Sequence, residues 1–157
     1  MAVAQYSFGY EVFDDSSSLN EDDRQLLSRA RDAAMNAHAP YSRFRVGAAA
    51  RLANGEVVTG ANQENASYPA GICAEGTTLS VASSLFPGMP ISTLAITYKS
   101  EEGKSDHPVA PCGICRQQLE EFRMRTGSPV RLIMTGETGQ VIVVEDASML
   151  MPFSFRF

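Results

Sequence analysis

The cysteines at positions 73, 112 and 115 restrict the possible fold of this chain more than any other residues. Cys112 and Cys115 have the C-x-x-C spacing, which allows two sulfurs on one helical turn to bind the same metal ion. Cys73 lies directly before one predicted helix, and the C-x-x-C pair opens another. A helix N-terminus carries partial positive charge and favours a thiolate. If all three sulfurs bind one metal, both helices must begin at the same edge of a sheet.

Hydrophobic periodicity and turn residues predict an α/β fold. A capping-box spacing at residues 18–21 begins a helix that Pro40 closes. The other expected elements are strand 46–52, a type I′ hairpin turn at Asn54-Gly55, strand 57–61, helix 74–85, strand 91–98, helix 113–125, strand 130–135 and strand 140–144. Strand–helix alternation in the second half implies right-handed crossovers and parallel pairing. We therefore expect a three-layer α/β/α arrangement with a mixed sheet of about five strands.

A chain of 157 residues is large enough for one hydrophobic core, and no linker or repeat divides it. We expect a single domain over residues 1–157, with residues 1–18 as an N-terminal extension. Residues 6–13 alternate in a way that fits either an edge strand or a disordered terminus. The polar residues 100–107 are expected to form a flexible insertion.

Composition excludes several classes of partner. The formal net charge is −5 and no run of Lys and Arg is present, which argues against a nucleic-acid partner. No apolar stretch approaches the roughly 18 residues that span a bilayer, so no membrane partner is expected. The N-terminus lacks a basic segment followed by an apolar one, and three cysteines do not form a disulfide framework. The expected location is therefore the cytoplasm, a reducing compartment.

Three interpretations of the cysteines remain open from their spacing alone. A structural zinc site needs a fourth ligand, and the candidates are His38 and His107, neither of which has ligand spacing. A thioredoxin-like redox pair uses two thiols and leaves Cys73 without a role. Three thiolates with an open fourth position fit a catalytic metal.

Glu75 follows Cys73 by two positions. A carboxylate so close to a metal can take a proton from bound water and deliver it to a leaving group. A glutamate in the first turn of a helix is also a common complement to the helix dipole. The combination with three cysteines favours the catalytic interpretation.

The cysteine motifs resemble those of the zinc-dependent nucleobase deaminases, in the three-cysteine variant. They are Cys73-Ala74-Glu75 and Pro111-Cys112-Gly113-Ile114-Cys115. Further segments are similar to the small cytidine deaminases that act on free nucleosides. These segments are Ala39-Pro40-Tyr41-Ser42, Phe44, Val46-Gly47-Ala48-Ala49, residues 62–68, Arg116-Gln117 and residues 150–155. The resemblance covers about residues 22–155.

This resemblance implies a Zn²⁺ cofactor and a set of site residues. Cys73, Cys112 and Cys115 would ligate the zinc, and Glu75 would shuttle protons. The implied substrate contacts are Phe44 against the nucleoside, Asn62 and Glu64 at the ribose hydroxyls, and the backbones of Ala74 and Cys112 at the pyrimidine. Family members are commonly homotetramers with shared active sites, and Ala66, Tyr68 and Phe155 would then serve a neighbouring subunit. A homodimer is the smaller alternative.

Two positions bear on the substrate and on turnover. In an extended segment Asn62 and Glu64 face the same side, and a carboxylate at the sugar repels a phosphate. This favours a free nucleoside over a nucleotide. Many three-cysteine relatives carry Arg after the catalytic Glu, where this chain has Gly76. Arg116, beside Cys115, could partly offset the negative charge of three thiolates from outside the ligand set.

The expected reaction is the hydrolytic deamination of cytidine or 2′-deoxycytidine to the uridine nucleoside and ammonia. Two other functions remain open because of Gly76. One is a deaminase of a related substrate, such as a blasticidin-type nucleoside antibiotic. The other is a zinc-binding relative that no longer catalyses. A separate, non-enzymatic alternative is a zinc-stabilised interaction domain, which a fourth protein ligand would indicate.

Overall fold

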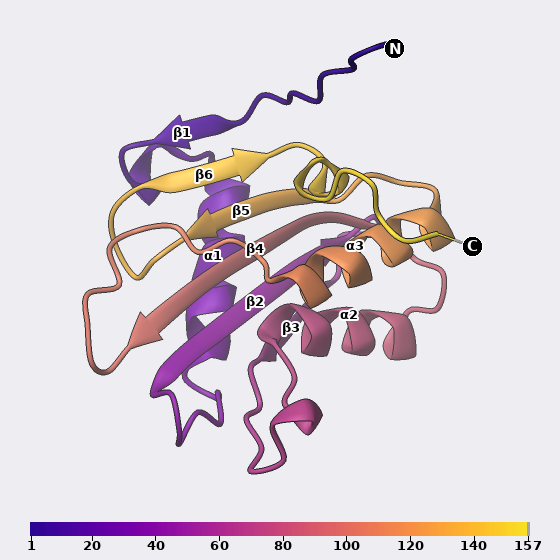
Figure 1. Cartoon of the computed structure of the whole chain (residues 1–157). Helices are drawn as coiled ribbons and strands as arrows, with labels where there is room; N and C mark the ends of the chain where they lie inside the picture. Colours follow the sequence, from indigo (N-terminus) through magenta and orange to yellow (C-terminus); the bar gives the residue numbers. More distant parts are fainter. Residues whose placement is uncertain (157) are drawn as a thin grey trace.

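The computed structural model describes residues 1–156, and they form one mixed sheet with helices on both faces (Figure 1). The strands are β1 (Glu11–Phe13), β2 (Phe44–Leu52), β3 (Val57–Ala61), β4 (Ile91–Ser100), β5 (Arg131–Thr135) and β6 (Val141–Val144). Their order across the sheet is β1-β6-β5-β4-β2-β3. Only β4 and β5 pair in parallel, and the other neighbouring strands pair antiparallel.

The sheet has six strands within the described residues, so the expectation of about five was one too low. The additional strand is β1, which pairs with β6 through Glu11 opposite Val143 and Phe13 opposite Val141. The alternation at residues 6–13 fitted either an edge strand or a disordered terminus, and the structure has a strand at Glu11–Phe13. Pairing with β6, far away in the sequence, is what orders it.

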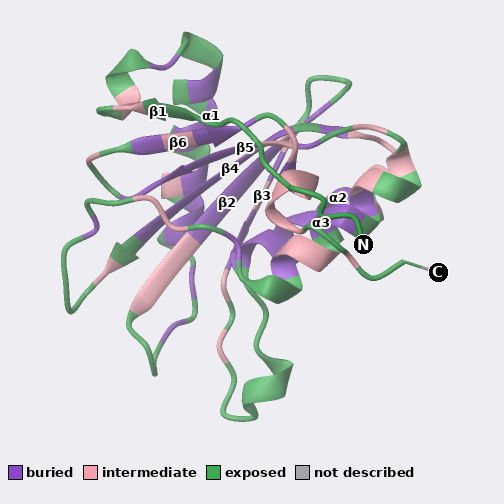
Figure 2. Ribbon diagram, turned by 45° about the horizontal axis from the view of Figure 1, so that its top comes forward, coloured by how far each residue is buried: buried purple, intermediate pink, exposed green. Residues whose placement is uncertain are grey.

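Three helices complete a three-layer α/β/α fold, as expected from the sequence. They are α1 (Glu21–Ala34), α2 (Ala74–Leu85) and α3 (Gly113–Thr126). The α1 helix covers one face of the sheet, where Leu26, Leu27 and Ala30 pack against strand residues. The α2 and α3 helices cover the other face, with Leu79 and Leu119 in the larger apolar cluster. In Figure 2 the buried residues follow the strands and the inner sides of the helices. No helix among residues 1–156 combines the length and the apolar character needed to cross a bilayer.

The boundaries of α1 differ from those predicted. Asn20, not Ser18, is the N-cap, because its side-chain oxygen accepts a hydrogen bond from the Asp23 N–H at 2.9 Å. Residues 16–18 form a separate 3₁₀ turn before it. The helix ends at Ala34 and not at Pro40. The apolar residue Ala37 is buried although it lies beyond the helix.

The β2–β3 hairpin was predicted correctly, but its turn type was not. Gly55 has φ of +89°, whereas Asn54 is not among the residues with positive φ, and a type I′ turn needs both. The Asn54 side chain instead accepts a hydrogen bond from the Glu56 N–H at 3.1 Å. The Leu52 N–H donates a hydrogen bond to Glu56 O at 2.8 Å, which closes the loop over residues 53–55.

The helices α2 and α3 both begin at the same end of the sheet (Figure 1). The chain enters α2 from β3 and α3 from β4, and β4 continues through α3 into the parallel strand β5. Gly127, with φ of +68°, ends α3 in the left-handed conformation. The two N-termini therefore converge, as one metal bound by all three cysteines requires.

Candidate metal and catalytic site

The three cysteine sulfurs lie together at the N-termini of α2 and α3. Cys73 is the N-cap of α2 and Cys112 the N-cap of α3, both with extended backbone, and Cys115 lies one turn into α3. The Sγ atom of Cys112 lies 3.8 Å from the Sγ atom of Cys73 and 3.5 Å from that of Cys115. All three sulfurs lie within 4.8 Å of one another. Thiolates around one tetrahedral zinc at Zn–S distances of about 2.3 Å are roughly 3.8 Å apart. The donor set and its spacing therefore fit a zinc ion.

Within residues 1–156, this group of metal-binding side chains contains the three cysteines and no histidine. Neither His38 nor His107 joins it, so the described residues supply three ligands. Three protein ligands leave a coordination position for water or substrate, which is the arrangement of a catalytic zinc.

The thiols of this cluster interact strongly with one another. Hydrogen bonds from Cys115 and Cys112 lower the pKa of Cys73 to about 6, against the opposing effects of burial and of the nearby Glu75 charge. The pKa of Cys115 is raised, first because it donates its proton to Cys73 and then because it is buried. Within this cluster Cys73 is therefore more acidic than Cys115.

Glu75 lies in the first turn of α2, and its side chain is 5% exposed. Burial raises the pKa of this carboxyl above its ordinary value, and a hydrogen bond from Cys115 opposes the shift. A carboxyl group with a raised pKa next to the metal ligands holds a proton more readily than an exposed one, and so can accept a proton and return it. This is the property that a proton shuttle needs.

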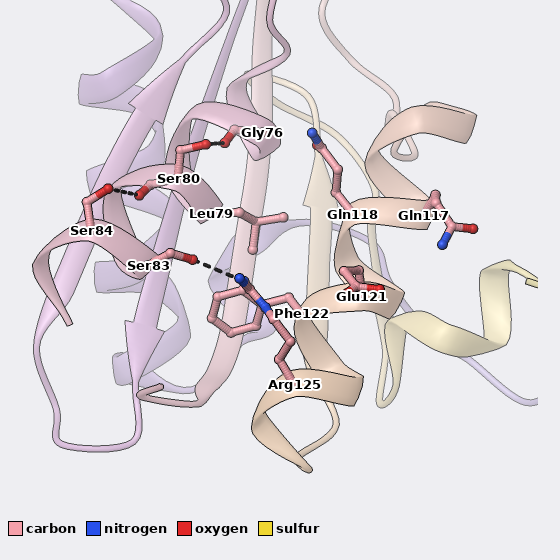
Figure 3. A pocket seen from close by; sticks show the side chains of 10 residues that line it. All are labelled: Gly76, Leu79, Ser80, Ser83, Ser84, Gln117, Gln118, Glu121, Phe122 and Arg125. Carbon is pink, nitrogen blue, oxygen red and sulfur yellow. Dashed lines mark hydrogen bonds between the residues drawn. The ribbon is translucent and has the colours of Figure 1, made fainter. Parts of the chain in front are cut away.

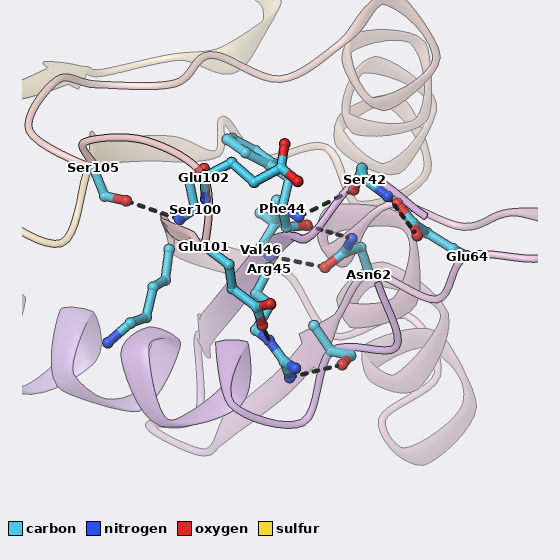
Figure 4. Close-up of polar contacts among 12 residues, drawn as sticks. Ser42, Phe44, Arg45, Val46, Asn62, Glu64, Ser100, Glu101, Glu102 and Ser105 are labelled. Carbon is cyan, nitrogen blue, oxygen red and sulfur yellow. Dashed lines mark hydrogen bonds and ion pairs between the residues drawn. The ribbon is translucent and has the colours of Figure 1, made fainter. Parts of the chain in front are cut away.

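The side chain of Asn62 reaches the start of β2. Its Oδ1 accepts a hydrogen bond from the Val46 N–H at 2.7 Å, and its Nδ2 donates one to Phe44 O at 3.0 Å (Figure 4). The amide therefore hydrogen-bonds the part of β2 that extends beyond its last pair with β3, Gly47 opposite Ala61. The structure gives Asn62 this backbone contact, which the sequence did not indicate.

Glu64 lines a cavity of about 420 Å³ near the same strand end. Its Oε2 accepts hydrogen bonds from the N–H groups of Tyr41, at 2.9 Å, and Ser42, at 3.3 Å. Hydrogen bonding, first from the Ser42 side chain, lowers the pKa of this carboxyl, so it is ionised at neutral pH. The cavity is lined by Tyr41, Ser42, Glu64, Asn65, Tyr68 and Gly71.

The cavity is connected to the metal site through the backbone. Gln63 and Ile72 exchange two N–H···O bonds of 2.9 Å, which fixes the segment containing Glu64 beside the residue that precedes Cys73. Tyr68 also lines this cavity, and its ring meets the ring of Tyr41 edge to face. Tyr68 is 78% exposed.

The remaining predicted site residues lie around this centre. Ala74 is fully buried at the start of α2, and Ala66 is exposed in the loop that follows Glu64. Phe155 is exposed near the C-terminus, and its backbone N–H and C=O bond to the Gln117 side chain on α3 at 3.2 and 3.0 Å. Phe44 is half-buried and stacks on Tyr98, a residue that the sequence analysis did not single out.

Arg116 contacts carbonyl groups on both sides of α3. Its Nε donates to Pro111 O at 2.8 Å and its Nη1 to Leu150 O at 3.1 Å. These bonds hold the residue before Cys112 and the segment after β6. Arg116 thus supports the metal site through the backbone next to Cys112.

Gly76 faces α3 across a groove of about 610 Å³ (Figure 3). A Cβ atom at this position would lie 2.9 Å from Gln118 Oε1 and 3.3 Å from Ile72 Cγ2. The groove is lined by Gly76, Leu79, Ser80, Ser83, Ser84, Gln117, Gln118, Glu121, Phe122 and Arg125. The end of the Gln118 side chain therefore occupies the space beside Gly76.

Comparison with known proteins agrees with this geometry. Residues 20–128 match the family described as the cytidine and deoxycytidylate deaminase zinc-binding region. A cytidine deaminase of Halalkalibacterium halodurans is 41% identical over 101 residues, which cover 64% of this chain and 72% of that protein. A cytidine deaminase of Mycobacterium tuberculosis is 43% identical over 96 residues, or 61% of this chain and 68% of that one.

Solved structures give the same result. The crystal structure of cytidine deaminase from Burkholderia pseudomallei matches with a TM-score of 0.73 and 34% identity, covering 87% of this chain and all of the other. The cytidine deaminase of Mycobacterium tuberculosis matches with a TM-score of 0.66 and 31% identity. With its three clustered thiols at two helix N-termini, this chain belongs to the zinc-dependent cytidine and deoxycytidylate deaminase family.

Proposed function

We propose that this protein hydrolyses cytidine and 2′-deoxycytidine to the corresponding uridine nucleosides, with release of ammonia. The observation that carries the proposal is the three-thiol cluster beside the buried carboxyl of Glu75. The family match and relatives named cytidine deaminase support it. Those relatives do not favour an antibiotic-deaminating or inactive protein.

In this proposal, Cys73, Cys112 and Cys115 hold the zinc. When bound, zinc would supply a Lewis acid that lowers the pKa of a water molecule in the open position. Glu75 accepts a proton from the attacking water and delivers protons to N3 and to the amino group that leaves C4. The oxygen of water adds to C4, the bond between C4 and the amino nitrogen breaks, and the products are the uridine nucleoside and ammonia.

The substrate contacts are proposed from the geometry around the cavity. The ionised Glu64 accepts hydrogen bonds from the ribose hydroxyls, and the Asn62 amide has one remaining N–H and lone pair for the same sugar. Phe44 packs against the nucleoside, and the backbones of Ala74 and Cys112 hold the pyrimidine. A fixed negative charge at the sugar disfavours a 5′-phosphate nearby. A free nucleoside is therefore the proposed substrate.

The assembly and the location of the protein are also proposals. Ala66, Tyr68 and Phe155 would complete the site of a neighbouring subunit in a homotetramer, or in a homodimer as the smaller assembly. Exposure of the Tyr68 and Phe155 residues at 78% and 65% supports a partner surface there. We propose that residues 1–157 act as one domain with an N-terminal extension over residues 1–18. Three free thiols, which a reducing environment preserves, support a cytoplasmic location.

One assay tests the activity. Ammonia release is measured from cytidine, deoxycytidine, cytosine and blasticidin, with zinc content determined on the same sample. We expect turnover of both nucleosides and little or none of the free base, because cytosine lacks the sugar that Glu64 would bind. Stoichiometric zinc with no ammonia from either nucleoside would contradict the proposal. Turnover of blasticidin alone would instead identify the antibiotic as substrate.

A further inference from the structure

Tyr98 lies beneath Phe44 near the end of β4. It is 2% exposed, and its ring stacks on that of Phe44 with centroids 4.6 Å apart and an interplanar angle of 21°. Tyr98 pairs with Val46 in the β2–β4 ladder, so Phe44 is its diagonal neighbour on the same face of the sheet. That face carries α2 and α3 and hence the cysteine cluster. The buried ring of Tyr98 thus sets the orientation of the Phe44 ring by stacking on it.

The Tyr98 ring is held in turn by His107. The Tyr98 hydroxyl lies 3.1 Å from His107 Nδ1 and 3.3 Å from Nε2, and the two rings meet edge to face at 5.6 Å. A buried tyrosine hydroxyl needs such a partner. His107 belongs to the segment that leads from β4 to Cys112. One hydrogen bond therefore joins this segment to the Phe44–Tyr98 stack.

The segment that follows β4 also forms hydrogen bonds with the start of β2. Glu101 N–H donates to Arg43 O at 3.0 Å, and the Glu101 carboxylate accepts from Arg45 Nε at 2.8 Å (Figure 4). The Ser100 N–H donates to Ser105 Oγ at 2.8 Å. Arg43, directly before Phe44, has φ of +53°, a conformation that is costly for a residue with a side chain. A costly backbone conformation persists only where its surroundings enforce it, and these contacts supply that constraint.

We propose that Tyr98 is a positioning residue for nucleoside binding, and that His107 holds it in place. Tyr98 orients Phe44 against the substrate without touching the reacting atoms. The inference rests on the proposed function, because it takes Phe44 as part of the nucleoside site. Since the pair supports binding and not proton transfer, its loss should change KM and leave kcat nearly unaltered.

Steady-state kinetics on a set of variants tests this role. Tyr98→Phe keeps the stack but loses the hydroxyl, and His107→Ala removes its partner. Each is expected to raise KM for cytidine about threefold, with kcat within about twofold of the wild type. The double variant should be no worse than either single one, because both remove the same bond. His107→Asn, whose amide can replace Nδ1, should restore much of the wild-type KM.

Tyr98→Leu removes the stack itself and is expected to raise KM about tenfold. Lys99→Ala is the matched control, since Lys99 is the next residue of β4 and its side chain pairs with Glu137. It should leave both constants unchanged. Thermal unfolding of each variant identifies any that fail to fold. If Tyr98→Leu does not fold, the Tyr98→Phe and His107→Ala cycle decides the question.

The outcomes separate this inference from the proposed function. Wild-type protein that releases no ammonia from cytidine or deoxycytidine overturns the deaminase function and the inference with it. An active wild type whose folded Tyr98 and His107 variants keep the wild-type KM overturns the inference alone. Additive effects in the double variant, or a fall in kcat at constant KM, would also contradict it.

Discussion

The reactive side chains of the site stand at helix starts, where local sequence places them. Cys73 and Cys112 are N-caps, and Glu75 and Cys115 follow in the first turns. Short spacing along one chain segment fixes such positions, so the motifs predicted them correctly. Asn62 shows the opposite case. Its amide bonds to the backbone of β2, and no pattern within its own segment indicates that partner.

Replacement of Glu75 by Gln tests its proposed role as the proton shuttle. The amide keeps the shape but cannot accept and return the proton, so kcat should fall by about 10³-fold or more. Zinc content and the thermal unfolding midpoint should stay close to those of the wild type. Ammonia release and zinc analysis on one preparation check both parts. Retained turnover would remove Glu75 from the mechanism.

Arg116→Gln is expected to lower turnover strongly and to reduce stability. The guanidinium is the basic group nearest in sequence to the thiolates, and it also donates hydrogen bonds to Pro111 O and Leu150 O. Loss of bonds to a charged donor costs about 1.5–3 kcal/mol each. Kinetics and denaturant unfolding measure the two effects separately. Arg125→Gln is the control, because Arg125 lies in the last turn of α3 and its guanidinium bonds to Ser83 of α2.

At the scale of elements, the site depends on how closely helices approach the sheet and one another. The α1 helix packs so tightly on β2 that a Cβ at Gly47 would lie 2.0 Å from Ala30 O. The α2–α3 pair is looser, with a groove beside Gly76. Gly47 lies in a strand and Gly76 in a helix, and the space around each decides whether a side chain can be accommodated there.

Alanine at these two glycines should have opposite effects on stability. Gly47→Ala forces α1 away from β2, because the clash is with backbone atoms, and should lower the free energy of unfolding by about 3 kcal/mol or more. Gly76→Ala meets only the flexible end of Gln118 and one methyl group, and it removes a helical glycine. It should raise the free energy of unfolding by about 0.5–1 kcal/mol. Urea unfolding of both variants is the measurement, and equal losses would contradict this interpretation.

The Glu120 carboxylate of α3 gives a prediction about pH. The group is 1% exposed and accepts hydrogen bonds from Arg123 at 2.8 and 3.0 Å, and it pairs with Arg156 at 2.8 Å. The Arg123 hydrogen bond, more than any other interaction, lowers the pKa of Glu120 below 4.5. Its stabilising effect is therefore complete above the unfolded pKa and is lost as the pH falls through the folded one.

Glu120→Gln should consequently destabilise the protein at pH 7 but much less at acidic pH. The difference in unfolding free energy between wild type and variant should shrink below about pH 4.5. Denaturant unfolding at a series of pH values measures it. Glu121→Gln, an exposed neighbour on the same helix, should show no comparable trend. If the difference in unfolding free energy between wild type and variant did not change with pH, the charge of Glu120 would not contribute to stability.

At the scale of the whole molecule, the family match covers residues 20–128, so β1 lies before it and β5 and β6 lie after it. That match begins at residue 20, whereas β1 lies at Glu11–Phe13 and extends the sheet at its edge. Tyr6, Phe8 and Tyr10 of the extension are exposed, whereas Phe13 packs against the core, and the Tyr6 hydroxyl donates to Met149 O at 2.7 Å. The extension thus joins the fold through β6 and the segment after it.

A shared site predicts complementation between inactive subunits. We expect sedimentation to give a tetramer and Phe155→Ala to impair catalysis. Glu75→Gln and Phe155→Ala subunits, dissociated and reassembled together, should regain activity, because some sites then combine an intact Glu75 with an intact Phe155 from the neighbour. Each variant reassembled alone is the control. A monomer in solution, or no gain in the mixture, would contradict shared sites.

The sequence by itself predicted the three-layer fold and the three-thiol cluster and placed Glu75 beside that cluster, because periodicity, capping positions and C-x-x-C spacing are local properties of the chain. It left the edge strand within residues 6–13 undecided, and it was wrong about the turn type at Asn54 and the N-cap at Asn20, because a strand partner far away in the sequence or one side-chain bond decides each of these. Only the tertiary structure placed Phe44, Tyr98 and His107 together. Those contacts join separate segments, and side-chain packing between segments leaves no periodic trace in the sequence.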